Sequence, residues 1–373
     1  MTEQRIYLDF NASTPLAPEV VEAMHPFLGT NFGNPSSPHW AGAPAKAAVE
    51  LARTKVAALL GAQPDEIVFT SGGTEANNHA LKGIFFANRQ RGDHIITTAV
   101  EHPAVLKPLE FLGSLGAKVT VVGVDDQGRV DPEAIRDAIT PRTILVSVMH
   151  ANNEVGTIQP IREIASIAHA AGVLVHTDAE QSVGKIPVRV DDLGVDLLSV
   201  AGHKLYAPKG VGALYVRRGT PVEPFMHGAG HEAGRRAGTE NVLFDVALGT
   251  ACEVAAGWIE MSAVRELRDR FEAELRSIFR TGITINGDGA DRLPNTSSVN
   301  FVGRVGADVL ASLPGVAAST GSACHAGSVE LSAVLAAMGV PTAAGMGAVR
   351  FSLGRTTTWA ELESVLAALR HSI

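Results

Sequence analysis

Short apolar runs alternate with longer segments of helical periodicity over the first two thirds of the chain. The apolar runs are nearly continuous and rich in β-branched residues, which is typical of strands covered on both faces. We expect strands at 66–69, 94–97, 118–121, 143–146, 173–176 and 196–199, and helices at 74–89, 104–115 and 161–171. Residues 211–216 are expected to return antiparallel to 196–200. This alternation predicts an α/β fold built on a largely parallel sheet.

The pattern changes in the last third of the chain. A long helix is expected at 242–279, followed by strands at 283–285, 297–301 and 349–353 and a final helix from Trp359. Strands and helices in this order are typical of a smaller α+β domain. We therefore expect a large domain at 15–255 and a small domain made of 1–14 and 256–373, the small domain carrying the segment around Cys324.

Composition narrows the class of protein. With 373 residues and 46% hydrophobic content, the chain can bury a large core in about two domains. The net charge of −8, without a basic run, argues against nucleic acid or an anionic membrane as a partner. Charged residues interrupt the apolar stretches and no signal-peptide pattern is visible, so we expect a cytoplasmic protein. The two cysteines, Cys252 and Cys324, suit neither a disulfide framework nor a closed zinc site, and no metal site is expected.

Lys204 and Asp178 are the first candidates for chemistry. Lys204 lies in a Gly-His turn after the strand at 196–199, and Asp178 ends the strand before it. A lysine amine can form a Schiff base with the aldehyde of pyridoxal phosphate, and a carboxylate can keep its pyridine nitrogen protonated. Because ligands bind at the carboxyl edge of such sheets, both side chains could share one crevice. A surface lysine and a turn aspartate are the alternatives for either residue alone.

Three further segments follow expected strands. The turn 71–77, Ser-Gly-Gly-Thr-Glu-Ala-Asn, opens a helix whose first N–H groups favour phosphate, although a plain helix cap with Thr74 as N-cap is equally compatible. His102 could stack on an aromatic cofactor and exchange protons, or cap a helix before proline. Asn153, in 152–156, offers an amide to a phenolic oxygen, or forms part of a turn.

Cys324 and Arg350 lie in the last third. Cys324 belongs to a small-residue segment, 320–328, which we expect to be a mobile, exposed loop, and this setting favours a reactive nucleophile. Cys252 is expected to be a helical core residue. Arg350, in the alternating run 348–353, could bind a carboxylate through two parallel hydrogen bonds, or form a surface ion pair.

Together these residues resemble the cysteine desulfurases and selenocysteine lyases of the class V aminotransferase family. The matching segments follow one another along essentially the whole chain, at 7–15, 33–39, 70–77, 101–102, 152–156, 178–185, 202–212, 230–232, 235–241, 321–325 and 350–355. The resemblance implies the architecture of a fold-type I, pyridoxal-phosphate-dependent transferase, with a mainly parallel seven-stranded sheet in the large domain and a smaller α+β domain.

The resemblance also implies a role for each matching residue. Lys204 would carry pyridoxal 5′-phosphate, Asp178 would pair with its pyridine nitrogen, and His102 would stack on its ring as an acid and base. The remaining implied cofactor ligands are Asn153 and Gln181 near the phenolic oxygen, and Thr74, His203 and Thr239 at the phosphate, with Thr239 supplied by the second subunit of a homodimer. The substrate carboxylate would bind Arg350 and Asn34, and Cys324 would accept sulfur as a persulfide.

The implied activity converts L-cysteine to L-alanine and passes the sulfur to an acceptor protein, for iron–sulfur cluster or other sulfur-carrier biosynthesis. Selenocysteine lyase is the alternative, because Ala323-Cys324-His325 also resembles that branch. An aminotransferase, or a non-catalytic scaffold for sulfur assembly, would retain the same fold. Ala201 departs from the pattern, since many desulfurases have a serine there whose hydroxyl helps to hold the phosphate. We therefore expect weaker cofactor retention.

Overall fold

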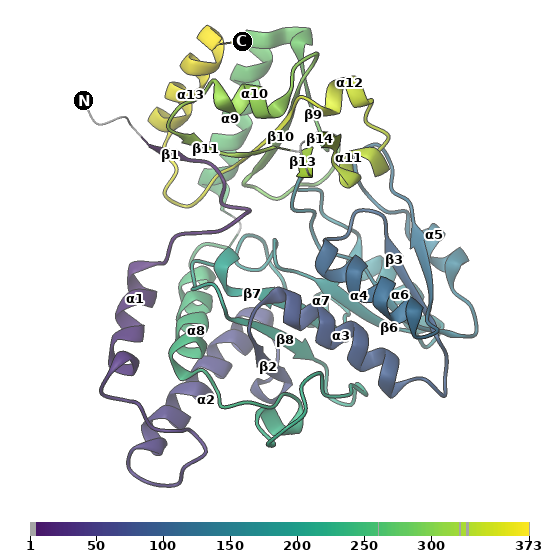
Figure 1. Cartoon of the computed structure of the whole chain (residues 1–373), viewed down its shortest axis with the longest axis vertical. Helices are drawn as coiled ribbons and strands as arrows, with labels where there is room; N and C mark the ends of the chain where they lie inside the picture. Colours follow the sequence, from purple (N-terminus) through teal and green to yellow (C-terminus); the bar gives the residue numbers. More distant parts are fainter. Residues whose placement is uncertain (1–4, 260, 321, 326–327, 373) are drawn as a thin grey trace.

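The computed structural model describes residues 5–259, 261–320, 322–325 and 328–372. A seven-stranded sheet and a four-stranded sheet lie one above the other in Figure 1. The larger sheet has the order β2-β8-β7-β6-β5-β3-β4. Its strands are β2 Ile67–Thr70, β3 His94–Thr98, β4 Lys118–Val122, β5 Thr143–Ser147, β6 Leu174–Asp178, β7 Leu197–Ala201 and β8 Gly212–Val216. The expected α/β fold is confirmed, and β8 runs antiparallel to β7 as expected and also antiparallel to β2.

Helices cover both faces of the larger sheet. Alternate residues of β2 point to opposite sides, with Ile67 and Phe69 in one apolar cluster and Val68 in another. The first face packs against α2 Gly42–Leu60, α6 Ile161–Ala170 and α8 Val242–Ala256, and the second against α3 Gly73–Ala87 and α4 Pro103–Ser114. This two-sided burial explains why the strands read as continuous apolar runs. The shorter helices in the part of the chain around this sheet are α1 Pro18–Met24, α5 Pro132–Ala138 and α7 Val190–Leu193.

The four-stranded sheet has its own core. It is antiparallel, in the order β12-β15-β10-β9, with bounds β9 Ile283–Ile285, β10 Thr296–Phe301, β12 Ser319–Thr320 and β15 Ala348–Ser352. Helices α9 Ser262–Phe279 and α13 Trp359–Ser372 pack on it, with the rings of Phe271 and Phe351 5.4 Å apart. Around it lie β1 Ile6–Tyr7 paired with β11 Val316–Ala317, and the helices α10 Gly306–Ala311, α11 Ala333–Ala337 and α12 Thr342–Gly345. The N-terminal strand therefore joins the C-terminal part of the chain.

The single helix expected at 242–279 is wrong. The structure has two helices there, because α8 ends at Ala256 and α9 begins at Ser262. Gly257 follows α8 directly, and Met261 adopts a left-handed backbone with φ 37°. A right-handed helix cannot continue through a left-handed residue. The apolar periodicity on both sides hid this turn from a pattern-based prediction.

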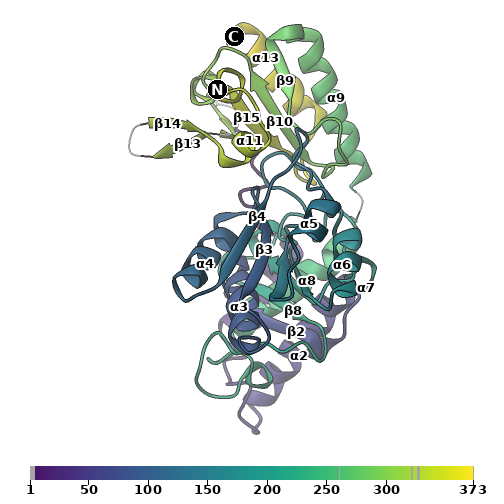
Figure 2. The same ribbon diagram turned by 90° about the vertical axis from the view of Figure 1, so that its right-hand side faces the viewer.

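Cys324 lies on a hairpin. Its backbone belongs to β13 Ser322–His325, which pairs antiparallel with β14 Ser328–Leu331, so Cys324 stands opposite Val329. Figure 2 shows this strand pair extending away from the body of the molecule, beside α11. The segment expected to be a loop therefore forms, in its described residues, a two-stranded ribbon.

Short 3₁₀ turns complete the description, at η1 His25–Leu28, η2 Pro64–Glu66, η3 Gly202–Lys204, η4 Glu232–Gly234 and η5 Arg280–Gly282. Among the helices that the structure describes, we find none both long and apolar enough to cross a lipid bilayer.

Candidate active site

A cavity of about 210 Å³ lies between the two sheets. Its walls come mainly from the segments that follow β3, β5, β6 and β7, at the carboxyl edge where open α/β sheets bind ligands. The four-stranded sheet contributes Arg350, and the segment after β1 contributes two residues. The lining residues are Asn11, Ala12, His102, Met149, Asn153, Asp178, Glu180, Gln181, Lys204 and Arg350. The structure therefore brings Lys204, Asp178, His102, Gln181, Asn153 and Arg350 together, as the sequence suggested.

Asp178 is the last residue of β6, and its carboxylate is buried. The Asn77 side-chain amide donates a hydrogen bond to Oδ2 at 2.8 Å, and the Glu180 backbone N–H donates to Oδ1 at 3.0 Å. Burial raises the pKa of Asp178, and these two hydrogen bonds and the nearby His102 and Lys204 offset part of that rise. The carboxylate is thus fixed in orientation while facing the cavity.

Lys204 ends the 3₁₀ turn that directly follows β7. Its Nζ donates to the Ala12 carbonyl at 2.9 Å and to the Asn11 carbonyl. Burial lowers the pKa of Lys204, and the nearby Glu180 acts in the opposite direction. A lowered pKa makes the neutral, nucleophilic amine more accessible. The turn is held by Tyr206, which has φ 62° and donates its backbone N–H to Thr14 Oγ1 at 2.7 Å.

His102 is the N-cap of α4. Its Nδ1 accepts a hydrogen bond from the Ala104 backbone N–H at 3.1 Å, which leaves Nε2 as the nitrogen free to exchange a proton. Burial lowers the pKa of His102, whereas Asp178 acts to raise it. Both interpretations of this histidine hold at once, because it caps a helix and lines the cavity.

Arg350 enters the cavity from β15. Its Nη1 donates to the Asn153 carbonyl at 2.9 Å, and its Nη2 donates to Asp9 Oδ1 at 2.8 Å and to Ser319 Oγ at 3.0 Å. Within the described part of the chain, the buried Nε has no hydrogen-bond partner. An unsatisfied guanidinium donor in a cavity suits an anionic ligand.

Four candidates do not line this cavity among the described residues: Asn34, Thr74, His203 and Thr239. Thr74 is exposed within the first turn of α3, and the N-cap is Gly72, whose φ of 144° suits glycine, so Thr74 is not the cap. His203 precedes Lys204, and burial together with the neighbouring Lys204 lowers its pKa to about 4. Asn34 and Thr239 are exposed.

Pattern reasoning missed several residues of the site. Asn77 holds Asp178, and Asn11 accepts from Lys204 through its backbone carbonyl. Lys185 is buried and donates to Gln181 Oε1 at 3.0 Å, which directs the Gln181 amide N–H toward the Asn11 carbonyl, 3.0 Å away. Glu180 was also missed. Its position two residues after Asp178, at the end of a strand, could have indicated that Glu180 lies in the site.

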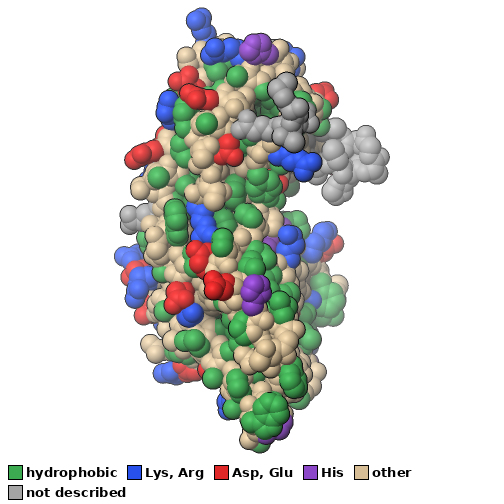
Figure 3. All heavy atoms as spheres, turned by 90° about the vertical axis from the view of Figure 1, so that its left-hand side faces the viewer, with side chains coloured by type: hydrophobic (Ala, Val, Ile, Leu, Met, Phe, Trp, Pro, Cys, Tyr) green, Lys and Arg blue, Asp and Glu red, His purple; other side chains and the backbone are tan. Residues whose placement is uncertain are grey.

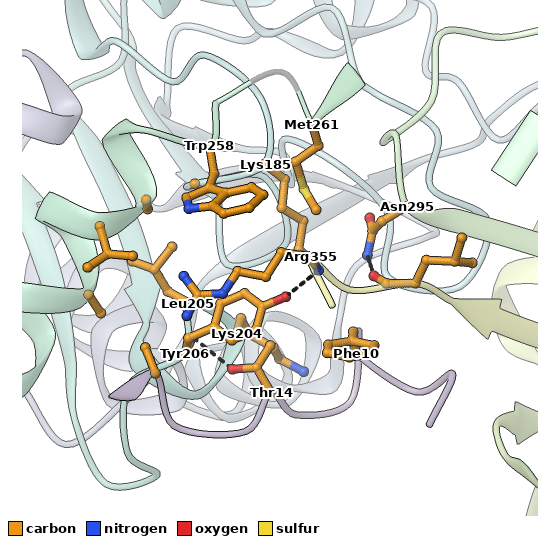
Figure 4. Close-up of a pocket in the computed structure, with 16 residues that line it drawn as sticks. Phe10, Thr14, Lys185, Lys204, Leu205, Tyr206, Trp258, Met261, Asn295 and Arg355 are labelled. Atoms are coloured by element: carbon orange, nitrogen blue, oxygen red, sulfur yellow. Dashed lines mark hydrogen bonds between the residues drawn. The ribbon is translucent and has the colours of Figure 1, made fainter. Parts of the chain in front are cut away.

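A second, mainly apolar pocket lies on another side of Lys204 (Figure 4). Trp258, Tyr206 and Arg355 form part of its wall, with the Arg355 guanidinium 4.4 Å from the centre of the Tyr206 ring and 5.7 Å from that of Trp258. The Arg355 backbone N–H also donates to the Tyr206 hydroxyl at 2.9 Å. These contacts connect the segment after β15 to the turn that carries Lys204.

The chain matches known proteins over almost its whole length. The profile of the family described as Aminotransferase class-V matches residues 6–365. The chain is 48% identical over 375 residues to the "Cysteine desulfurase IscS" of Dictyoglomus turgidum, covering 100% of this chain and 95% of that protein. Among solved structures, a "NIFS-LIKE PROTEIN" superposes with a TM-score of 0.92 at 38% identity, covering 99% of each chain. The structure of "SspA in complex with cysteine" superposes with a TM-score of 0.82 at 38% identity, covering 93% of this chain and 98% of that one.

Proposed function

The chain belongs to the class V aminotransferase family, and we propose that it is a cysteine desulfurase that converts L-cysteine to L-alanine. One observation carries this proposal: Lys204 and Asp178 line the same cavity, with Arg350 presenting an unsatisfied donor from the opposite side. The full-length similarity to a protein named as a cysteine desulfurase, and to a structure solved with cysteine, supports the choice of substrate.

The residues of the cavity fit pyridoxal 5′-phosphate. A buried carboxylate, a partly buried amine and the amide of Gln181 are the groups that a pyridine nitrogen, an aldehyde and a phenolic oxygen require. Asp178, Lys204 and Gln181 would hold these three parts, with Asn153 beside Gln181. When bound, pyridoxal phosphate supplies the aldehyde for the lysine amine and a protonated ring that withdraws electrons from the substrate carbon.

Lys204 and His102 are the groups that move protons. The lowered pKa of Lys204 favours its neutral amine, which can take the proton from the substrate Cα. His102 has Nδ1 committed to the Ala104 N–H, so its Nε2 is the atom that gives or accepts a proton inside the cavity. Burial lowers the pKa of His102 and favours the neutral ring, in which Nδ1 is the acceptor and Nε2 carries the proton that can be donated into the cavity.

Arg350 is the residue for the substrate carboxylate. Its two terminal nitrogens are held by Asn153, Asp9 and Ser319, which fixes the plane of the guanidinium. The buried Nε remains as a donor for the carboxylate of cysteine. A fixed arginine orients the substrate and reduces the entropy that binding would otherwise lose.

Cys324 is the residue we propose as the sulfur acceptor. Its thiolate would attack the sulfur of the substrate, so that an S–S bond forms while the C–S bond breaks. The electron pair stays on the former substrate carbon, which later takes up a proton. Cysteine and thiol thus become alanine and persulfide, and the persulfide sulfur passes on to an acceptor protein, for iron–sulfur cluster or other sulfur-carrier biosynthesis. The position of Cys324 on the β13–β14 hairpin, which Figure 2 shows extending from the body, supports such a transfer.

We also propose a homodimer. Large apolar side chains are exposed around α1 and the start of α2, among them Leu28 at 66%, Phe32 at 74% and Trp40 at 82%. Figure 3 faces this side and shows hydrophobic side chains gathered toward the lower end of the molecule. Such a surface is typical of an interface. Thr239 is exposed, which supports its acting at the cavity of the second subunit.

The domain division proposed for the chain places 15–255 in one unit and 1–14 with 256–373 in the other. The separate apolar clusters around the two sheets support this division. Residues Ile6 and Leu8 belong to the same cluster as Phe351, although they begin the chain.

The test is a visible spectrum of the purified protein, followed by quantification of alanine and sulfide after L-cysteine is added. We expect a yellow protein that releases equal amounts of alanine and sulfide when a reductant is present. A yellow protein that acts on selenocysteine and not on cysteine would contradict the desulfurase assignment and favour the lyase. A colourless protein that pyridoxal phosphate cannot turn yellow would contradict the cofactor as well.

A further inference from the structure

The carboxyl group of Glu180 occupies the space where Gly73 would carry a side chain. A Cβ built on Gly73 would lie 1.5 Å from Glu180 Oε1 and 2.0 Å from Glu180 Cδ. Such contacts require the neighbouring group to move. Gly73 begins α3 as its first helical residue and is not among the glycines with positive φ, so its backbone does not demand glycine. The Glu180 carboxyl group thus occupies the space that a side chain at position 73 would need.

This carboxyl group lies among the groups that hold the proposed cofactor. The Asn77 amide contacts both acids, at 2.8 Å from Asp178 Oδ2 and 3.4 Å from Glu180 Oε1. Lys204 lines the same cavity. Gly73 itself belongs to the segment 71–77 that opens α3 and that the sequence indicates for phosphate. Two carboxyl groups and one amine therefore meet beside the predicted anion site.

Charged groups on β6, η3 and α3 lie around Glu180. Asp178 on β6 repels its anion, and Lys204 on η3 attracts it. Glu75 on α3 is paired with Arg236 at 2.8 Å. Burial, then Asp178, raises the pKa of Glu180 well above its usual range.

His102 and Arg350 are the other charged or titratable groups that line the same cavity. Burial lowers the pKa of His102, and Arg350 is paired with Asp9 at 2.8 Å. Asp178 and Lys204 are the charged neighbours that act most strongly on the ionisation of Glu180.

We propose that Gly73 and Glu180 form a matched pair, and that Glu180 is a positioning residue whose ionisation controls how firmly the site holds its cofactor. The inference rests on the proposed function, because it concerns the pyridoxal phosphate site. An ionised Glu180 adds a second negative charge next to Asp178 and weakens the binding of an anionic phosphate, whereas a protonated Glu180 does not. Gly73 keeps this side chain against α3 and out of the centre of the cavity.

The steric part is tested with Gly73→Ala, Glu180→Ala and the double variant. In Gly73→Ala the added Cβ displaces the carboxyl group, and we expect the loaded full-length protein to lose pyridoxal phosphate on the order of tenfold faster in dialysis. Removing the Glu180 side chain in the double variant should restore retention to that of Glu180→Ala. The matched control is Gly113→Ala in α4, where an added Cβ meets nothing within 4 Å. Equal retention in Gly73→Ala and wild type, or no rescue in the double variant, would overturn the pairing.

Thermal unfolding of the same proteins without cofactor gives a second readout. Gly73→Ala should lower the midpoint, and the double variant should recover it, because the clash exists whether or not the site is loaded. Failure of this recovery would overturn the matched pair even if the wild-type protein proved to bind no pyridoxal phosphate. The steric inference and the proposed function can therefore fail separately.

The electrostatic part is tested with Glu180→Gln, which keeps the shape and removes the charge. Cofactor retention in wild type should fall relative to Glu180→Gln as the pH is raised from about 6 to about 9, because loss of the proton from this carboxyl group, whose pKa burial and Asp178 raise, adds a negative charge to the site. We expect a difference on the order of tenfold at the upper end. A constant ratio across the range would overturn the electrostatic role. A wild-type protein that holds the cofactor and turns over cysteine would then leave the proposed function standing.

Discussion

The Arg350 guanidinium lies 2.8 Å from the Asp9 carboxylate, although the two residues are separated by 341 positions in the sequence. Asp9 follows β1, and Arg350 stands in the middle of β15. The pair joins the N-terminal segment to the four-stranded sheet at the edge of the cavity. It also holds one end of the guanidinium, whose buried Nε has no hydrogen-bond partner within the described part of the chain.

Replacing Arg350 by lysine should weaken cysteine binding more than it slows the chemistry. A lysine provides one point charge in place of a planar donor, so it cannot satisfy Asn153, Asp9 and the substrate together. We expect KM for cysteine to rise by about tenfold or more, with a smaller loss in kcat. Steady-state alanine release measures both, with exposed Arg370→Lys as the control. An unchanged KM would remove Arg350 from the substrate site.

Lys204→Ala should abolish the yellow colour that cofactor attachment produces. The Nζ of Lys204 is held by the Asn11 and Ala12 carbonyls, and Lys204 lines the cavity. Lys185 is also buried nearby, but its Nζ is directed to Gln181 and Asn11. The visible spectrum after addition of pyridoxal phosphate measures the effect, and exposed Lys209→Ala is the control. A yellow Lys204→Ala protein would point to another lysine.

Cys324→Ala should stop sulfur transfer while leaving the absorbance of the bound cofactor intact. The matched control is Cys252→Ala in α8, since Cys252 is 1% exposed and burial raises its pKa to about 12. We expect Cys252→Ala to cost about 1 kcal/mol of unfolding free energy and to keep its turnover. Sulfide and alanine release measure activity, and thermal unfolding measures stability. Normal turnover by Cys324→Ala would exclude it as the sulfur acceptor.

We expect the Glu101→Gln variant to lose less unfolding free energy than the wild type as the pH rises. Burial raises the pKa of Glu101 from 4.5 to about 8, against hydrogen bonds from the Met149 N–H and the Thr98 hydroxyl. A carboxyl group whose folded pKa is raised contributes stability below pH 4.5, and this contribution is lost as the pH rises through about 8.

Denaturant unfolding at about pH 5 and about pH 9 measures this difference. At the higher pH we expect Glu101→Gln to exceed wild type in unfolding free energy by on the order of 2 kcal/mol, with a much smaller difference at the lower pH. The control is Glu110→Gln, an exposed residue of α4. A difference that stays the same at both pH values would mean that Glu101 does not take up a proton on folding.

Ala201→Ser should slow the loss of cofactor. Ala201 ends β7 and is 1% exposed, just before the turn that carries Lys204. A hydroxyl at this position adds one hydrogen bond of about 1 kcal/mol, which corresponds to roughly fivefold slower loss. Dialysis of the loaded protein measures it, with Ala213→Ser on the neighbouring strand β8 as the control. Equal or faster loss would show that position 201 does not reach the phosphate.

The pairing of Lys204 with Asp178 could be predicted because it depends on local information. Each residue ends an apolar run, and the ends of adjacent parallel strands meet at one edge of a sheet. The two helices at 242–279 could not be separated in this way, since the left-handed backbone of Met261 interrupts the helix without interrupting the apolar pattern. The sequence also could not show that the N-cap of α3 is Gly72, with a φ of 144°, and not Thr74.

Most strands, the mainly parallel sheet and the residue types of the site could be predicted from the sequence, because periodicity and strand ends are properties of neighbouring positions. Which groups touch one another depends on how the chain packs in three dimensions. Arg350 contacts Asp9, Asn77 holds Asp178, and the Glu180 carboxyl group rests on Gly73. These contacts join segments that are far apart in the chain. Their distances and burial arise only when the two apolar cores pack against each other, and a local sequence pattern does not encode that packing.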